Sequence, residues 1–100
     1  MDLFIGVLNL SIFFNIDDLA EKRALINRLR EIASSRFNMS FAELKNQDMF
    51  RSVDLVFSSI STNKDLLNSG FDSLVNVFKQ IEELVIVKEQ RNVITTNRES

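Results

Sequence analysis

The side chains that most often do chemistry in proteins are missing from this chain. It has no His and no Cys, which removes the commonest zinc ligand, the commonest general base and every thiolate nucleophile. The only glycines are Gly6 and Gly70, so the sequence holds no glycine-rich phosphate loop. We therefore expect no catalytic residue, no metal site and no cofactor.

Glu43 and Asp48 are a pair of carboxylates that flank a polar segment between two expected strands. Such a pair could hold Mg²⁺ or act as acid and base. The alternative is that they cap a turn and pair with Arg51 or with an arginine of the preceding helix. Because no third ligand stands nearby, we favour the structural alternative and expect that the protein is not an enzyme.

A basic cluster occupies residues 19–37, where five Lys and Arg against two Glu give a local charge of +3. One face of the helix expected there collects residues at i, i+4, i+7 and i+11: Arg23, Asn27, Arg30 and Ser34. This face could contact RNA phosphates. The alternative, which we favour, is a solvated face whose Arg stems lie along apolar neighbours. The whole chain carries −2 and has a pI of about 5.1, which argues against nonspecific binding of polyanions, DNA included.

Hydrophobic patterning predicts the elements that must position these residues. Asp18 with Glu21, and Thr62 with Asp65, have the spacing of capping boxes at two helix starts. The first helix then runs to about Ser35, and the second carries an apolar stripe from 67 to 81. Alternating or continuous apolar runs predict strands at 3–14, 37–43, 53–60 and 84–95.

The element order is therefore β-α-β-β-α-β in one domain, residues 1–96, with a frayed polar tail at 97–100. Right-handed crossovers predict an α+β ferredoxin-like two-layer sandwich, with a four-stranded antiparallel sheet and two helices on one face. The apolar start at 3–14 lacks a cleavage site and is too short to span a bilayer. We expect a cytoplasmic protein that does not enter a membrane.

One face of the predicted sheet has no helix to cover it. Leu8 and every second residue after it are apolar and should face the helices. Apolar residues of the same strand must then lie on the opposite face, and an uncovered apolar face usually has a partner, often a second copy of the chain. The candidate dimer face is Ile5, Val7 and Phe13. The RNA-recognition fold shares this element order, but residues 53–59 lack the glycine and basic residues of its binding strand.

Several segments match a known family in order and without large gaps: residues 5–8, 21–23, 36–43, 47–53 and 61–63. In these segments the chain resembles the YlxP-like family, small bacterial proteins grouped as a domain of unknown function. The family usually has Trp where Phe50 stands here. The resemblance implies a ferredoxin-like fold in a bacterial cytoplasm. Members are often encoded beside translation-initiation and ribosome-maturation factors, which implies a partner in the ribosome or RNA.

The family-typical polar positions, together with the helix stripe, give the candidate partner- or RNA-binding residues: Lys22, Arg23, Asn27, Arg30, Asn38, Glu43, Gln47, Asp48 and Arg51. Two hypotheses follow. The first is a non-enzymatic binding module linked to ribosome maturation or translation. The second is a homodimeric structural or protein-interaction domain that uses the uncovered sheet face.

Overall fold

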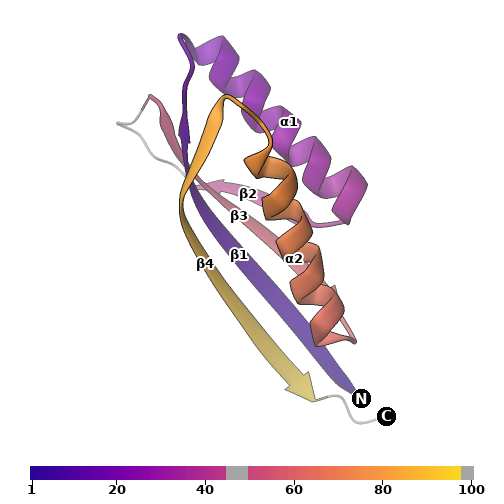
Figure 1. Ribbon diagram of the computed structural model, residues 1–100. Helices are drawn as coiled ribbons and strands as arrows, with labels where there is room; N and C mark the ends of the chain where they lie inside the picture. The colour runs from indigo at the N-terminus through magenta and orange to yellow at the C-terminus, as the bar shows by residue number, and fades with distance from the viewer. Residues whose placement is uncertain (45–49, 98–100) are drawn as a thin grey trace.

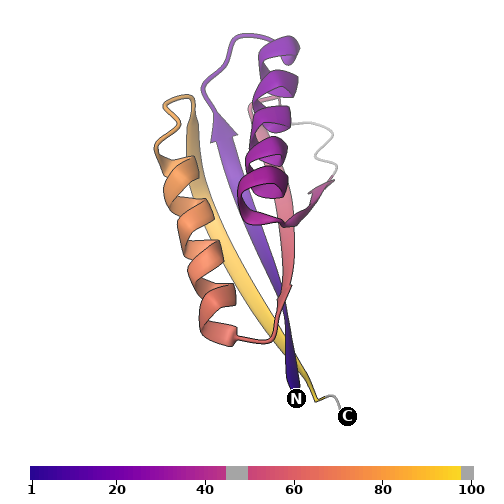
Figure 2. The same ribbon diagram turned by 90° about the vertical axis from the view of Figure 1, so that its right-hand side faces the viewer.

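The computed structural model describes residues 1–44 and 50–97 of the chain. Its elements are β1 (Asp2–Phe14), α1 (Leu19–Phe37), β2 (Ser40–Leu44), β3 (Ser52–Ser61), α2 (Lys64–Lys79) and β4 (Leu84–Asn97). The strands form one antiparallel sheet in the order β2-β3-β1-β4. Both helices lie on the same side of this sheet (Figures 1 and 2). The predicted ferredoxin-like sandwich is therefore confirmed.

The core lies between the sheet and the two helices. Leu8, Leu10 and Ile12 of β1 are buried and point toward the helices, as their alternation predicts. Phe57 of β3 and Phe78 of α2 meet edge to face, with ring centroids 5.5 Å apart, a favoured aromatic geometry. β1 is central in the sheet, and its inward side chains belong to the same buried cluster as the apolar side chains of both helices.

A side chain caps the N-terminus of each helix, and in each case one bonded residue differs from the predicted capping box. Asp18 accepts from the backbone N–H of Glu21 at 2.8 Å, while the Glu21 carboxylate accepts from the N–H of Asp17, also at 2.8 Å. In a standard capping box Glu21 would accept from the N–H of the cap residue Asp18. Here it accepts instead from the N–H of Asp17, the residue before the cap. At α2 the prediction of Thr62 was wrong by one residue. Asn63 is the cap, because its amide oxygen accepts from two backbone N–H groups, at 3.0 and 3.1 Å.

The end of α1 corrects the predicted start of the second strand. Phe37 is the last residue of α1 and β2 begins at Ser40, so the alternation from Phe37 onward spans a helix end. Asn38 adopts a left-handed conformation, with φ 52° and ψ 44°, which Asn tolerates better than most residues. The N–H of Met39 then donates to the carbonyl of Ala33 at 3.0 Å, and this bond closes the helix.

β4 pairs with β1 along its whole length, from Asp2 to Phe14. The register shifts between Ser11 and Ile12, which pair with Lys88 and Ile86, so Val87 is the extra residue of a bulge. At the far end Asn97 pairs with Asp2. The first residue of the expected polar tail is therefore part of the strand, and residues 98–100 lie outside the described ranges.

Gly6 allows α2 to approach β1 closely. A Cβ atom at this position would lie 2.6 Å from Cε2 of Phe71, whose ring is fully buried. We predict that Gly6→Ala lowers the free energy of unfolding by about 1–3 kcal/mol, because a packed ring must move to make room. Urea denaturation of the purified variant measures this difference.

Gly70→Ala is the matched control. A Cβ there would meet its nearest neighbour, Cε of Met39, at 3.5 Å, an ordinary contact. Since Gly70 is inside α2, the change should raise the free energy of unfolding by about 0.4–1 kcal/mol. If Gly6→Ala proved as stable as Gly70→Ala, the close packing of Phe71 would not constrain β1.

Candidate functional site

The arginine face of α1 leans against the edge strand β2. Nη2 of Arg23 donates to both carboxylate oxygens of Glu43, at 2.8 and 2.7 Å. The guanidinium carbon of Arg30 lies 5.0 Å from the ring centroid of Phe41, within cation–π range. These contacts match the structural alternative for both features, since Glu43 pairs with an arginine of the helix and Arg30 covers an aromatic ring.

Two other basic candidates join the start of β3 to the neighbouring elements. Lys22 is buried, and its Nζ donates to the carbonyl of Ser52 at 3.2 Å. Nε of Arg51 donates to the carbonyl of Ile16 at 3.1 Å. Both side chains therefore hold backbone in place, and the ammonium of Lys22 is not presented to a partner at the surface.

The other predicted binding residues within the described ranges do not lie beside the side chains discussed above. Asn38 is the left-handed residue that ends α1, and Asn27 is exposed on that helix. Gln47 and Asp48 lie outside the described residues. The structure thus brings Arg23, Arg30 and Glu43 together, and it places the other described candidates at separate points. Within residues 1–44 and 50–97 no group of three His, Cys, Asp or Glu side chains could hold a metal ion.

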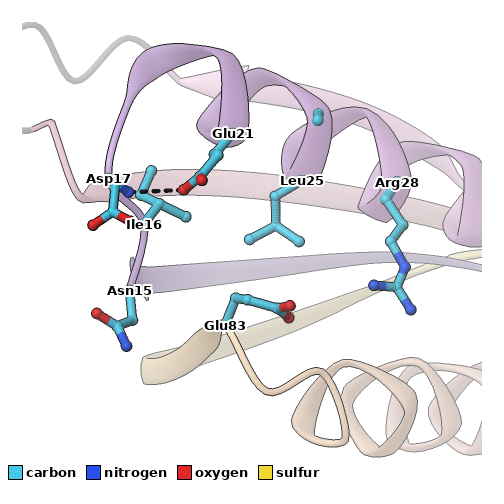
Figure 3. Close-up of a pocket in the computed structure, with 8 residues that line it drawn as sticks. Asn15, Ile16, Asp17, Glu21, Leu25, Arg28 and Glu83 are labelled. Atoms are coloured by element: carbon cyan, nitrogen blue, oxygen red, sulfur yellow. Dashed lines mark hydrogen bonds between the residues drawn. The ribbon is translucent and has the colours of Figure 1, made fainter.

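A shallow hollow of about 510 Å³ opens beside the start of α1 (Figure 3). Leu25 and Arg28 extend from α1 toward the segment that carries Glu83. The carboxylate of Glu21 is already engaged by the N–H of Asp17. Sequence reasoning did not find this hollow, because its walls come from three separate segments: Asn15, Ile16, Asp17, Glu21, Ala24, Leu25, Arg28 and Glu83.

The larger unpartnered surface is the face of the sheet opposite the helices, here called the outer sheet face. Strand pairing arranges its side chains in rows across β3, β1 and β4. Ile5 pairs with Ile60 on one side and with Ile94 on the other, and these two flanking side chains are 63% and 50% exposed. The result is an apolar row near the N-terminal end of β1.

A second apolar group lies at the other end of the outer sheet face. Phe13 pairs with Val85, which is 56% exposed. Between the two ends Ser11 pairs with Asp54 and Lys88, and its hydroxyl donates to the Asp54 carboxylate at 2.6 Å. The predicted Ile5, Val7 and Phe13 all lie on this face, but their neighbours on β3 and β4 were not predicted. Those neighbours depend on strand register, which the sequence does not show directly.

The ion pair between Arg23 and Glu43 can be tested by a double-mutant cycle with Arg23→Gln and Glu43→Gln. The Arg23 side chain is 53% exposed, and water weakens an exposed pair. We therefore predict a coupling free energy of only about 0.2–1 kcal/mol in urea unfolding, smaller at high salt. A coupling of zero at low salt would contradict the assignment of Arg23 to holding α1 against β2.

Several proteins of known structure have the same fold as this chain. A proposed antibiotic biosynthesis monooxygenase from Chloroflexus aurantiacus has a TM-score of 0.56 at 12% identity, covering 95% of this chain and 97% of that one. A dimeric ferredoxin-like protein from an uncultured marine organism has a TM-score of 0.54 at 11% identity, with both chains covered completely. A protein named YJCS has a TM-score of 0.52 at 17% identity, covering 95% and 99%. At such identities the likeness concerns the fold alone.

No curated protein matches the sequence. None of the helices in residues 1–44 and 50–97 is long and apolar enough to cross a membrane. A family model described as a protein of unknown function, DUF503, matches residues 5–91. This range is most of the 100 residues and contains the main segments that carry the YlxP-like resemblance. The chain therefore belongs to the DUF503 family.

Proposed function

We propose that the chain is a non-catalytic association module whose binding surface is the outer sheet face. The observation that carries the proposal is the concentration of exposed apolar side chains there. Five of the ten large hydrophobic residues that are exposed in the described part of the chain lie on this face: Phe13, Leu44, Ile60, Val85 and Ile94. Exposed apolar side chains gathered on one face in this way typically mark an interaction site.

The two faces of the sheet differ because the helices cover only one of them. Each fully buried side chain of the Val, Leu, Ile or Phe type contributes about 1.5–3 kcal/mol relative to its exposed state. On the inner face that free energy stabilises the fold, but on the outer face it is available only to a partner. The solved neighbour described as dimeric is consistent with association by a domain of this shape.

The absence of cysteine from the chain allows a clean test of whether the outer sheet face is covered. Ile60→Cys places a thiol on that face, and Ser73→Cys places one on exposed α2 as the matched control. We predict that maleimide labels Ile60→Cys at least tenfold more slowly in expressing cells than in dilute purified protein, because a partner excludes the reagent. Ser73→Cys should show no such difference. Equal labelling of Ile60→Cys under both conditions would contradict the proposal.

The basic side of α1 supports a second candidate function, contact with RNA in or around the ribosome. Four arginines on this helix are exposed: Arg23, Arg28, Arg30 and Arg36. Arg28 and Arg36 have no ion pair within the described ranges. Their charges are therefore available to phosphate groups, and such contacts would release counterions and weaken with salt. The genomic neighbourhood typical of the YlxP-like family supports the same candidate.

Sedimentation of the tagged protein with ribosomal subunits tests this second candidate. We predict co-migration at low salt, and its loss at high salt or in the double variant Arg28→Gln with Arg36→Gln. The control is Lys64→Gln with Lys79→Gln, which removes the same charge from α2. If the control lost binding equally, a general charge effect would replace α1 as the explanation. Failure to co-migrate at low salt would remove the candidate.

A further inference from the structure

We propose that the outer sheet face binds a second copy of this chain, related to the first by a two-fold axis that runs along β1. This inference rests on the proposed function, because it names the partner of the same surface. It is carried by the arrangement of charge on that surface. One row across the sheet holds an acid on β3 and a base on β4, at equal distances from the central strand.

The charged row consists of Asp54, Ser11 and Lys88, in that order across the sheet. Asp54 accepts a hydrogen bond from Ser11 at 2.6 Å, which fixes its carboxylate on the outer face. Lys88 is exposed, and none of the described acidic side chains forms an ion pair with it. The surface therefore displays an acid and a base on opposite sides of β1.

A two-fold axis along β1 exchanges the two flanks of the sheet. It places β3 of each copy over β4 of the other, so that Asp54 lies opposite Lys88 of the second copy, twice in the dimer. The same operation places Ile60 opposite Ile94 and brings the two Ile5 side chains together. Both the charged row and the apolar row are thus complementary to themselves, as an isologous interface requires.

The other simple arrangement, with the axis across the strands, fits less well. When such an axis crosses the row of Asn9, it reverses the rows along the strand direction and brings the charged row over the row of Val7, which holds Ser58 and Asn92. Asp54 and Lys88 would then face uncharged groups, and each would lose water without gaining an opposite charge. The charge pattern therefore favours the axis along β1.

The dimensions of the face suit a small dimer. Ten residue steps from Leu3 to Phe13 span about 33 Å at the rise of a strand, and three strands with their side chains span roughly 15 Å. The projected area is roughly 500 Å² per copy, or about 1,000 Å² in total, which is the lower end for a specific interface. Packed sheets lie about 10 Å apart and within roughly 30° of each other, and the long stem of Lys88 can accommodate that angle.

Charge exchange between the two positions tests the arrangement. In Asp54→Lys both flanks carry lysine, and in Lys88→Asp both carry aspartate, so each variant repels itself in the proposed dimer. We predict that each raises the dissociation constant of its own dimer at least tenfold. A mixture of the two variants should form heterodimers, because every facing pair is then opposite in charge. The double variant with both changes should dimerise like the unmodified chain.

Native mass spectrometry of the separate and mixed variants measures how much homodimer and heterodimer each sample forms. Circular dichroism checks that each variant is folded. If both single variants self-associated as tightly as the unmodified chain, or if the mixture showed no preference for the heterodimer, the axis along β1 would be wrong. A monomeric unmodified chain at all concentrations would overturn the second copy as partner. In that case protection of Ile60→Cys in cells would still support an association surface, so the two failures are distinguishable.

Discussion

The structure depends on β1, which lies inside the sheet and has apolar side chains on both of its faces. Its inward residues share one buried cluster with the apolar side chains of both helices, and Gly6 lets Phe71 of α2 approach the backbone directly. Two helices joined by right-handed crossovers can cover only one face of a four-stranded sheet. The outward residues of β1 therefore stay exposed together with the neighbours that pairing brings beside them on β3 and β4. Fold and proposed binding surface follow from the same strand.

Most of the polar candidates for partner binding whose contacts the structure describes hold this sandwich together. Arg23 and Glu43 join α1 to β2, and the carbonyl of Ser52 accepts from the buried Lys22. Arg51 reaches back to the turn before α1. An arginine-rich helix face is therefore weak evidence for RNA when an acid or an aromatic ring lies on the next strand. Arg28 and Arg36, which line a hollow together with Val77 and Gln80 of the α2 region, carry the remaining argument for a nucleic-acid contact.

The order and type of the elements could be predicted from periodicity and caps, because these signals are local. The error at Phe37 arose where local signals are ambiguous, since an alternating apolar pattern continued across a helix end that only the left-handed Asn38 marks. The outer sheet face was predicted through Ile5, Val7 and Phe13. Ile60 and Ile94 were missed because strand register is a tertiary property, and a slip of one residue would turn them to the other face.

In the proposed dimer, charge and apolar surface act together on the outer sheet face. The apolar rows supply most of the free energy of association, whereas the row of Asp54 and Lys88 selects one orientation. The outer residues can serve association alone, because the core of the monomer, centred on Leu8, Leu10 and Phe57, is complete without them. The monomer fold and the association are then separable.

The most direct test of the proposed dimer is an isotope-filtered NMR experiment on a mixture of labelled and unlabelled copies of the unmodified chain. It detects only contacts between different molecules. We predict intermolecular contacts between the methyl groups of Ile60 and Ile94, and between the two Ile5 side chains. Intermolecular contacts confined to α1 or α2, or none at concentrations well above the micromolar range, would contradict it.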